Sequence, residues 1–147
     1  LPDLKYVSAG RSTAYSNAPN YFSMAGEAIL EMIRQVGPVV LDEKGIMRSG
    51  VMIRHLVMPG GVRDSVRCLK WIKENVPQGV YLSLMAQYMP TSQVKDQPVI
   101  NRKLRKKEYE TVIEEMLKLG LEDGYIQELT SASEDYVPKF DLTGILS

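Results

Sequence analysis

Polar side chains that could bind a ligand fall on apolar segments of this chain. Asp3 and Lys5 alternate with Leu4 and Tyr6, so in a β-strand the carboxylate and the ammonium share one face. Arg54 lies in the middle of a second apolar segment, where an arginine is rarely buried unless it is paired. Its guanidinium fork matches a ligand carboxylate or phosphate. The structural alternatives are an exposed Asp3–Lys5 pair, worth about 0–1 kcal/mol, and a structural salt bridge at Arg54.

Further polar residues lie on the same apolar segments or directly after them. They are His55, Ser83, Gln87 and Tyr88. Ligands of parallel α/β proteins bind at the C-terminal ends of the strands, so side chains from different strands could converge on one mouth. His55 is the only histidine and faces away from Arg54, which favours a packing role over a catalytic one.

Two other motifs have a structural and a functional interpretation. Pro59-Gly60-Gly61 follows the second apolar segment, and its backbone N–H groups could approach an anion, although ordinary turns use the same residues. A basic run at 102–107 precedes a predicted helix, where cations oppose the helix dipole. Arg105 also occupies the position where Ser or Thr would complete a capping box with Glu108. Because the net charge is zero, a solvated connector is favoured over a nucleic-acid site.

Composition describes an ordinary globular chain with little thiol chemistry. The 147 residues suit one domain, and no apolar run approaches the roughly 20 residues that span a bilayer. Cys68 is the only cysteine, so neither an internal disulfide nor a cysteine-rich metal site is expected, and we predict an inert thiol. A reducing cytoplasm is the expected compartment.

Hydrophobic patterning predicts alternating strands and helices. Strands are predicted at 1–7, 51–58 and 80–88, and the last two are nearly continuous apolar runs of the kind found in parallel sheets. Helices are predicted at 21–36, 63–75 and 106–119. The inward stripe of the first helix is expected to comprise Phe22, Ala25, Ile29, Met32 and Val36.

Smaller elements complete the predicted α/β domain, 1–147. A short hairpin is expected at 39–47, a fourth short strand at 124–129 and an irregular tail at about 130–147. Alternating strands and helices predict a parallel sheet. Three strands cannot close a barrel, so we expect open edges and homo-oligomers formed through the unpaired strand at 1–7.

The order of several short motifs resembles one known family. They are Leu1-Pro2-Asp3-Leu4-Lys5-Tyr6, Tyr15-Ser16-Asn17-Ala18-Pro19, Arg54-His55-Leu56-Val57-Met58-Pro59-Gly60 and Ser83-Leu84-Met85-Ala86-Gln87-Tyr88, followed by the segment 120–134. In this order they resemble the C-terminal half of a radical S-adenosylmethionine (SAM) protein similar to pyruvate formate-lyase activating enzyme. The resemblance covers nearly the whole chain.

This resemblance implies a fold and an activity for the parent protein. The fold would be a parallel-stranded partial TIM-type barrel, of which this chain forms the C-terminal half of a (β/α)6 barrel with a small hairpin insertion. The family carries a [4Fe–4S] cluster on a Cys-x3-Cys-x2-Cys loop, and S-adenosylmethionine bound to that cluster yields a radical that abstracts hydrogen. In activating enzymes the hydrogen comes from a glycine of a partner enzyme.

The same resemblance assigns residues to cofactor binding. Asp3 and Lys5 match the family's Asp-Leu-Lys strand near the S-adenosylmethionine and the substrate, and Arg54 matches an arginine of the following strand. Gln87 or Tyr88 falls near a position where activating enzymes place a histidine. No residue is assigned to catalysis or to a metal.

One cysteine cannot ligate the cluster, so this chain alone is expected to be inactive. The parent would be an iron–sulfur oxidoreductase of the glycyl-radical activase type, acting on a protein or small-molecule C–H bond. Its N-terminal barrel half, which carries the cluster, would be the partner of this chain; nucleic acid and membrane are not expected partners. Two alternatives are a non-enzymatic truncated barrel module that binds a ligand or protein, and a phosphate-binding barrel segment that uses Pro59-Gly60-Gly61 with Arg54.

Overall fold

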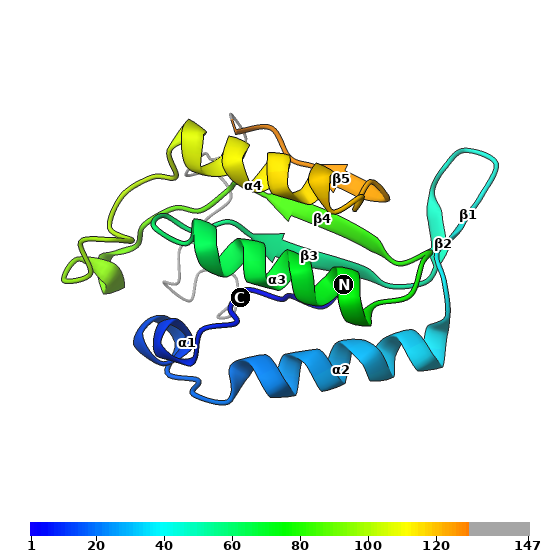
Figure 1. Cartoon of the computed structure of the whole chain (residues 1–147), viewed down its shortest axis with the longest axis horizontal. Coiled ribbons are helices and arrows are strands. Elements are labelled where there is room, and N and C mark those ends of the chain that lie inside the picture. The colour runs from blue at the N-terminus through cyan, green and yellow to red at the C-terminus, as the bar shows by residue number, and fades with distance from the viewer. Residues whose placement is uncertain (130–147) are drawn as a thin grey trace, which may run out of the picture.

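The computed structural model describes residues 1–129 and shows a mixed α/β arrangement with helices packed on one side of a sheet (Figure 1). Among these residues the parallel sheet is open, and it does not close into a barrel. In chain order the elements are α1 (Ala9–Ser16), α2 (Tyr21–Val36), β1 (Val40–Leu41), β2 (Met47–Ser49), β3 (Met52–Leu56), α3 (Val62–Asn75), β4 (Tyr81–Met85), the short 3-10 helix η1 (Ser92–Val94), α4 (Lys106–Lys118) and β5 (Gly124–Ile126).

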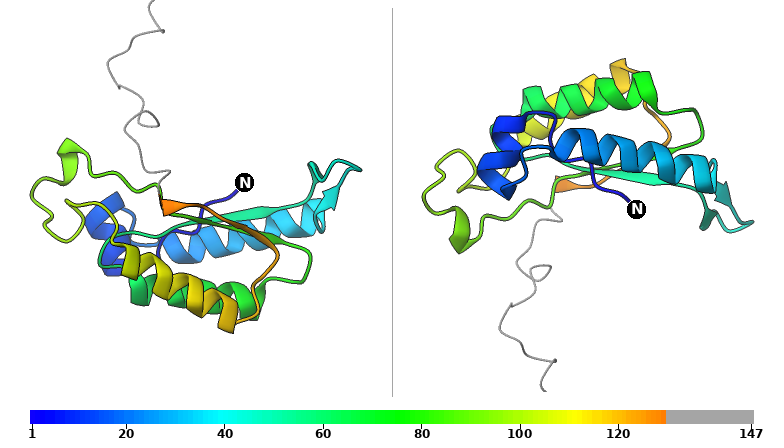
Figure 2. Two further views of the ribbon diagram at one scale, coloured as in Figure 1. Left: turned by 90° about the horizontal axis from the view of Figure 1, so that it is seen from above. Right: turned by 90° about the horizontal axis from the view of Figure 1, so that it is seen from below.

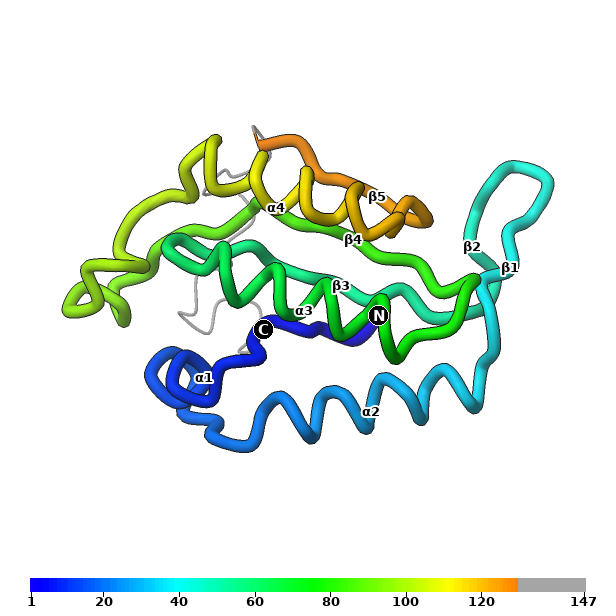
Figure 3. The backbone as a smooth tube through the Cα atoms, in the orientation of Figure 1, coloured from blue at the N-terminus to red at the C-terminus, as the bar shows by residue number. Residues whose placement is uncertain are grey.

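The main sheet has the parallel order β3-β4-β5. Arg54 of β3 is in register with Ser83 of β4, and Ser83 with Tyr125 of β5. The chain's first residues run beside β3, as Figure 3 shows, and form one parallel bridge between Asp3 and Arg54. This arrangement confirms the predicted parallel sheet, the short fourth strand and the β1–β2 hairpin.

Helices α2, α3 and α4 all lie on the same side of the sheet (Figure 2). The strand residues that face them form the core with the apolar helix stripes, since alternate residues of a strand point to opposite faces. The residues in or directly beside the strands that have no more than 4% exposure on this covered face are Leu4, Val51, Ile53, His55, Val57, Leu82, Leu84 and Ala86. Helix α4 contributes its buried residues Tyr109, Val112 and Met116.

The predicted inward stripe of α2 is partly wrong. Ile29 is buried, but Met32 and Val36 are 42% and 49% exposed, and Ile33 is buried instead. Gly26 explains the rotation of the helix, because a Cβ at this position would lie 3.0 Å from the Trp71 ring of α3. The helix therefore turns its smallest residue toward the largest side chain of its neighbour, and the apolar period alone did not reveal this.

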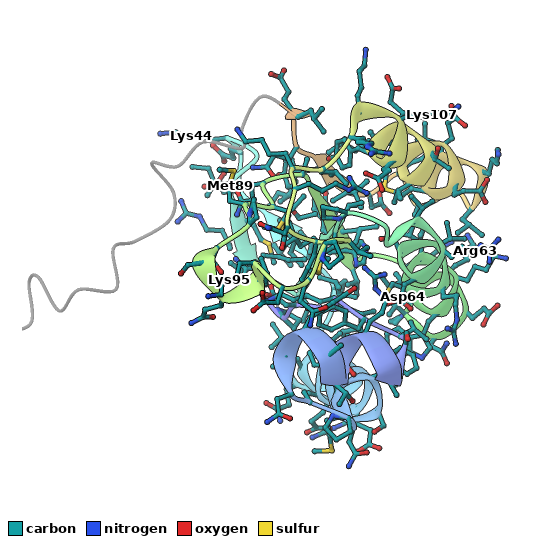
Figure 4. All side chains as sticks on the ribbon, turned by 90° about the vertical axis from the view of Figure 1, so that its left-hand side faces the viewer. Lys44, Arg63, Asp64, Met89, Lys95 and Lys107 are labelled. Carbon is teal, nitrogen blue, oxygen red and sulfur yellow. The ribbon has the colours of Figure 1, made fainter. Side chains whose placement is uncertain are left out.

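The predicted strand at 1–7 is shorter than expected. Only Pro2 and Leu4 exchange backbone hydrogen bonds with Arg54. Beyond them, the N–H groups of Val7 and Ser8 donate to the two carboxylate oxygens of Asp64, at 3.2 and 2.9 Å, and the chain enters α1. Figure 4 shows Asp64 at the start of α3. The Asp64 side chain thus replaces the backbone acceptors that a longer strand would have used.

Helix α1 was not predicted because it has no apolar stripe. The Ser8 hydroxyl accepts from the N–H of Arg11 as an N-cap, and Asn17 ends the helix in the left-handed conformation (φ 49°). The irregular tail expected from Thr130 lies outside the described residues. No helix within residues 1–129 combines the length and apolar character needed to cross a membrane.

Candidate functional site

Three of the four predicted site residues meet on the face of the sheet that no helix within residues 1–129 covers, which we call the uncovered face. Arg54 Nε donates to Asp3 Oδ1 at 2.7 Å, and Lys5 Nζ lies 3.2 Å from Asp3 Oδ2. The parallel Asp3–Arg54 bridge places these side chains next to each other on adjacent backbones. One carboxylate is thus held between two cations, and the cluster carries one net positive charge.

The Asp3–Lys5–Arg54 cluster is accessible to a ligand. The side chains of Asp3, Lys5 and Arg54 are 30%, 38% and 41% exposed. Ion pairs at this exposure contribute only about 0–1 kcal/mol to folding, so stability alone is a weak reason for the arrangement. Guanidinium and ammonium donors beside a carboxylate acceptor can together recognise a ligand that carries a carboxylate and hydroxyl or amino groups.

Gln87, the fourth predicted residue, lies apart from this cluster. It follows β4 four positions after Ser83, which corresponds to about 13 Å along an extended chain. Its Oε1 accepts from Gln127 Nε2 at 2.9 Å, while Gln127 Oε1 accepts from the N–H of Ala86 at 3.0 Å. Gln127 therefore fixes the orientation of the Gln87 amide.

Tyr88 and Ser83 have different positions relative to the cluster. The Tyr88 ring is buried with Tyr6, Met58 and Ile100, and its hydroxyl donates to the Ile100 carbonyl at 2.9 Å. Tyr88 is therefore a packing residue. Ser83 is half-buried and in register with Arg54, so it extends the polar part of the uncovered face.

The Pro59-Gly60-Gly61 turn already holds an anion of the protein. The Gly60 N–H donates to Glu108 Oε1 at 2.7 Å. Glu108 also forms a two-pronged ion pair with Arg102 and accepts from the Arg105 N–H. The Arg102 guanidinium is the main reason that the pKa of Glu108 falls to about 2. This carboxylate occupies the Gly60 N–H that a phosphate would need, and it offsets part of the basic run.

His55 is a packing residue, as expected. The side chain is fully buried on the covered face, and its Nδ1 lies 2.6 Å from the Leu4 carbonyl. Burial lowers the pKa of the imidazole, so the ring is neutral and Nδ1–H is the donor. Among residues 1–129 its Nε2 has no hydrogen-bond partner. The residue links the first segment to β3 from the side opposite Arg54.

Cys68 has the properties of a structural thiol. It is fully buried in α3, and burial raises its thiol pKa well above the usual range. A thiol that stays protonated is a poor metal ligand and nucleophile. Within the described part of the chain, no three His, Cys, Asp or Glu side chains are grouped so that they could hold a metal ion.

A cavity of about 720 Å³ lies at the N-terminal ends of β3 and β4. Its polar lining includes Lys73, Glu122 and Asp123, and none of the predicted site residues contributes to it. Ligands in parallel α/β sheets bind at the opposite, C-terminal ends of the strands. The cavity is therefore not a part of the Asp3–Lys5–Arg54 site.

Sequence reasoning missed the residues that hold the predicted ones in place. Tyr21, Asp64, Glu108 and Gln127 each make hydrogen bonds to a backbone or side chain far away in the sequence. Glu108 carried a usable signal, because it lies three residues after the N-cap position of a helix, Arg105. The partners of the other three depend on how the elements pack.

Fold and site together define a parallel α/β chain with an uncovered sheet face that carries a cationic cluster. No protein-family model matches the chain, and no solved structure matches it. Among curated proteins, it is similar to the uncharacterized protein MJ0674 of Methanocaldococcus jannaschii, with 29% identity over 123 residues. The match covers 83% of this chain but 32% of that protein, so the chain spans about a third of the length of this relative.

Proposed function

We propose that this chain is the C-terminal half of a partial TIM-type barrel of the radical S-adenosylmethionine class, and that its uncovered sheet face lines the lumen. The parent would be an activase-like oxidoreductase that removes a hydrogen atom from a C–H bond. The Asp3–Lys5–Arg54 cluster carries this proposal, because three of the four residues assigned by the family resemblance lie in contact on one face.

The one-sided packing of helices supports a barrel half. In a (β/α) barrel all helices lie outside and the opposite face of each strand points into the barrel. Here α2, α3 and α4 cover one face, while the other carries half-buried side chains of both polar and apolar type. These are Met52, Arg54, Leu56, Tyr81, Ser83, Met85 and Gln87.

The residues of this chain do not fit the cluster itself. A [4Fe–4S] cluster needs several thiolates, and the single cysteine is buried in a helix with a raised pKa. When present in the parent, the cluster and S-adenosylmethionine supply the radical chemistry. The Asp3 carboxylate and the Lys5 and Arg54 cations would bind and orient the methionine and ribose groups of the cofactor, or the substrate.

A titration with S-adenosylhomocysteine tests the cofactor site. This stable analogue keeps the adenosine and amino-acid groups that the Asp3–Lys5–Arg54 cluster would contact. We expect NMR shifts at Arg54 Nε and at the Lys5 and Ser83 amides, with an affinity no tighter than about millimolar for half a site. Asp3→Asn should remove these shifts. Asp42→Asn is the matched control, since Asp42 pairs with Arg48 on the distant hairpin.

Two results would overturn the proposal. The first is an analogue that leaves the Asp3–Lys5–Arg54 signals unchanged, or that shifts them equally in Asp3→Asn. The second is a stoichiometric [4Fe–4S] spectrum after reconstitution of this chain alone with iron and sulfide. The iron–sulfur cluster would then not require the N-terminal half of the barrel.

A further inference from the structure

The backbone groups of the first segment are bonded on both of its sides. In a parallel ladder, one residue donates its N–H to the carbonyl before the opposite residue and accepts from the N–H after it. Arg54 does this around Asp3 on the inner side. Its N–H donates to the Pro2 carbonyl at 2.8 Å, and its carbonyl accepts from the Leu4 N–H at 2.9 Å.

A tyrosine hydroxyl repeats this pattern on the outer side, around Leu4. Tyr21 Oη donates to the Asp3 carbonyl at 2.8 Å and accepts from the Lys5 N–H at 3.0 Å. A hydroxyl can make both bonds because it is at once a donor and an acceptor. One oxygen thus reproduces both ladder bonds that a residue of a neighbouring parallel strand would make.

The packing of Tyr21 holds the hydroxyl in this place. Tyr21 is the first residue of α2, which is anchored in the core by Ile29 and Ile33. Its ring packs edge-on against Tyr6, with 5.4 Å between the ring centroids. Burial also raises the pKa of the phenol, so the donor proton is retained at neutral pH.

We propose that Tyr21 acts as a strand mimic that closes the outer edge of the first segment to a strand of a second copy of this chain. This inference does not rest on the proposed function; in the parent barrel, the preceding strand would have to displace the Tyr21 hydroxyl from this edge. The strand that a second copy offers is β5. The Leu82 N–H donates to the Asp123 carbonyl and the Gln127 N–H to the Leu84 carbonyl, so alternation turns the N–H groups of Gly124 and Ile126 to the other side.

One edge of the sheet is the first segment and the other is β5, and this difference sets the geometry of association. Within residues 1–129, β5 has a strand neighbour on one side only. All four backbone segments run parallel, so the first segment of one copy can pair with β5 of the next without reversing direction. Such a contact is head to tail, and it produces rings or chains of copies. Tyr21 prevents this assembly by occupying the Asp3 and Lys5 groups that it requires.

Tyr21→Phe tests the proposal with the loss of one oxygen, and Tyr125→Phe, on exposed β5, is the matched control. In Tyr21→Phe, the Lys5 amide should exchange hydrogen about 10-fold faster or more, relative to the Leu84 amide of the core. Sedimentation should show a monomeric wild type and species that grow with concentration in the variant. Adding Ile126→Pro, which removes an outward N–H of β5, should restore the monomer.

Several outcomes would overturn the proposal. One is a Lys5 amide that exchanges in Tyr21→Phe at the wild-type rate, or whose exchange accelerates only by the same factor as that of the Leu84 amide. Another is a Tyr21→Phe protein that stays monomeric at the highest concentration reached. Association that persists with Ile126→Pro would exclude β5 as the second edge, and equal association of Tyr125→Phe would show that the effect is not specific to Tyr21.

Discussion

The two faces of the parallel sheet differ in chemistry although they alternate along the same strands. On the covered face, Leu84 and His55 are fully buried against helices, and even the histidine is used for packing. On the uncovered face, Arg54 and Asp3 are partly exposed and paired with each other. The covered face therefore supplies most of the folding free energy, and the uncovered face can carry a charged cluster that contributes little to stability.

Truncation of neighbouring residues of β4 should separate the two faces most clearly. Leu84→Ala removes a fully buried side chain from the core, and we expect a loss of about 2–5 kcal/mol in the free energy of unfolding. Met85→Ala, on the half-buried uncovered face, should cost clearly less. Urea denaturation of both variants measures the difference. Equal losses would mean that the uncovered face is packed as firmly as the core.

His55 should make the stability of the covered face depend on pH. Its pKa is lowered in the folded state by burial, so below about pH 6.5 the unfolded chain binds a proton that the folded chain does not. The contribution of the neutral His55 ring to the free energy of unfolding is fully present above that pH. It decreases as the pH falls toward the pKa of His55 in the folded state. The slope should reach at most about 1.4 kcal/mol per pH unit.

The measurement is urea denaturation between pH 7.5 and about 5.5, above the range of ordinary carboxylates. Since His55 is the only histidine, His55→Gln should remove the slope in this interval, whatever its effect on stability at pH 7.5. A wild-type protein with constant stability across the interval would show that the ring is charged or accessible in the folded state.

The charged cluster should give the smallest effect. A double-mutant cycle with Asp3→Asn and Arg54→Met should show a coupling of about 0–1 kcal/mol, because both side chains are partly exposed. The same variants should change binding of S-adenosylhomocysteine far more than they change folding. A coupling as large as the loss at Leu84 would identify the Asp3–Arg54 pair as a structural feature and would remove the contrast between the faces.

Much of the fold could be predicted from local sequence. Continuous apolar runs predicted β3 and β4, and α2 matches the predicted span of residues 21–36. The alternation of Leu4 and Tyr6 with Asp3 and Lys5 also predicted which of these side chains are buried. Such features depend on periods of two or 3.6 residues, which the sequence displays directly.

The structure corrected predictions that depend on distant partners. The rotation of α2 depends on Trp71 facing Gly26, and the early end of the first strand depends on Asp64. The open edge at 1–7, from which we predicted self-association, has its outer Asp3 and Lys5 groups bonded to Tyr21. Self-association of the wild-type chain stays untested, and we now expect association only after that hydroxyl is removed.

For the main strands, the sequence alone indicated which residues share a face, because side-chain direction follows from backbone geometry. It also determined that the chain has too few thiols for an iron–sulfur cluster. Packing of the elements brings Arg54 to Asp3, places Glu108 in the Gly60 turn and pairs Gln87 with Gln127, away from the Asp3–Lys5–Arg54 cluster. These contacts join residues 40 or more positions apart, and their geometry depends on strand register and helix packing, which no local pattern encodes.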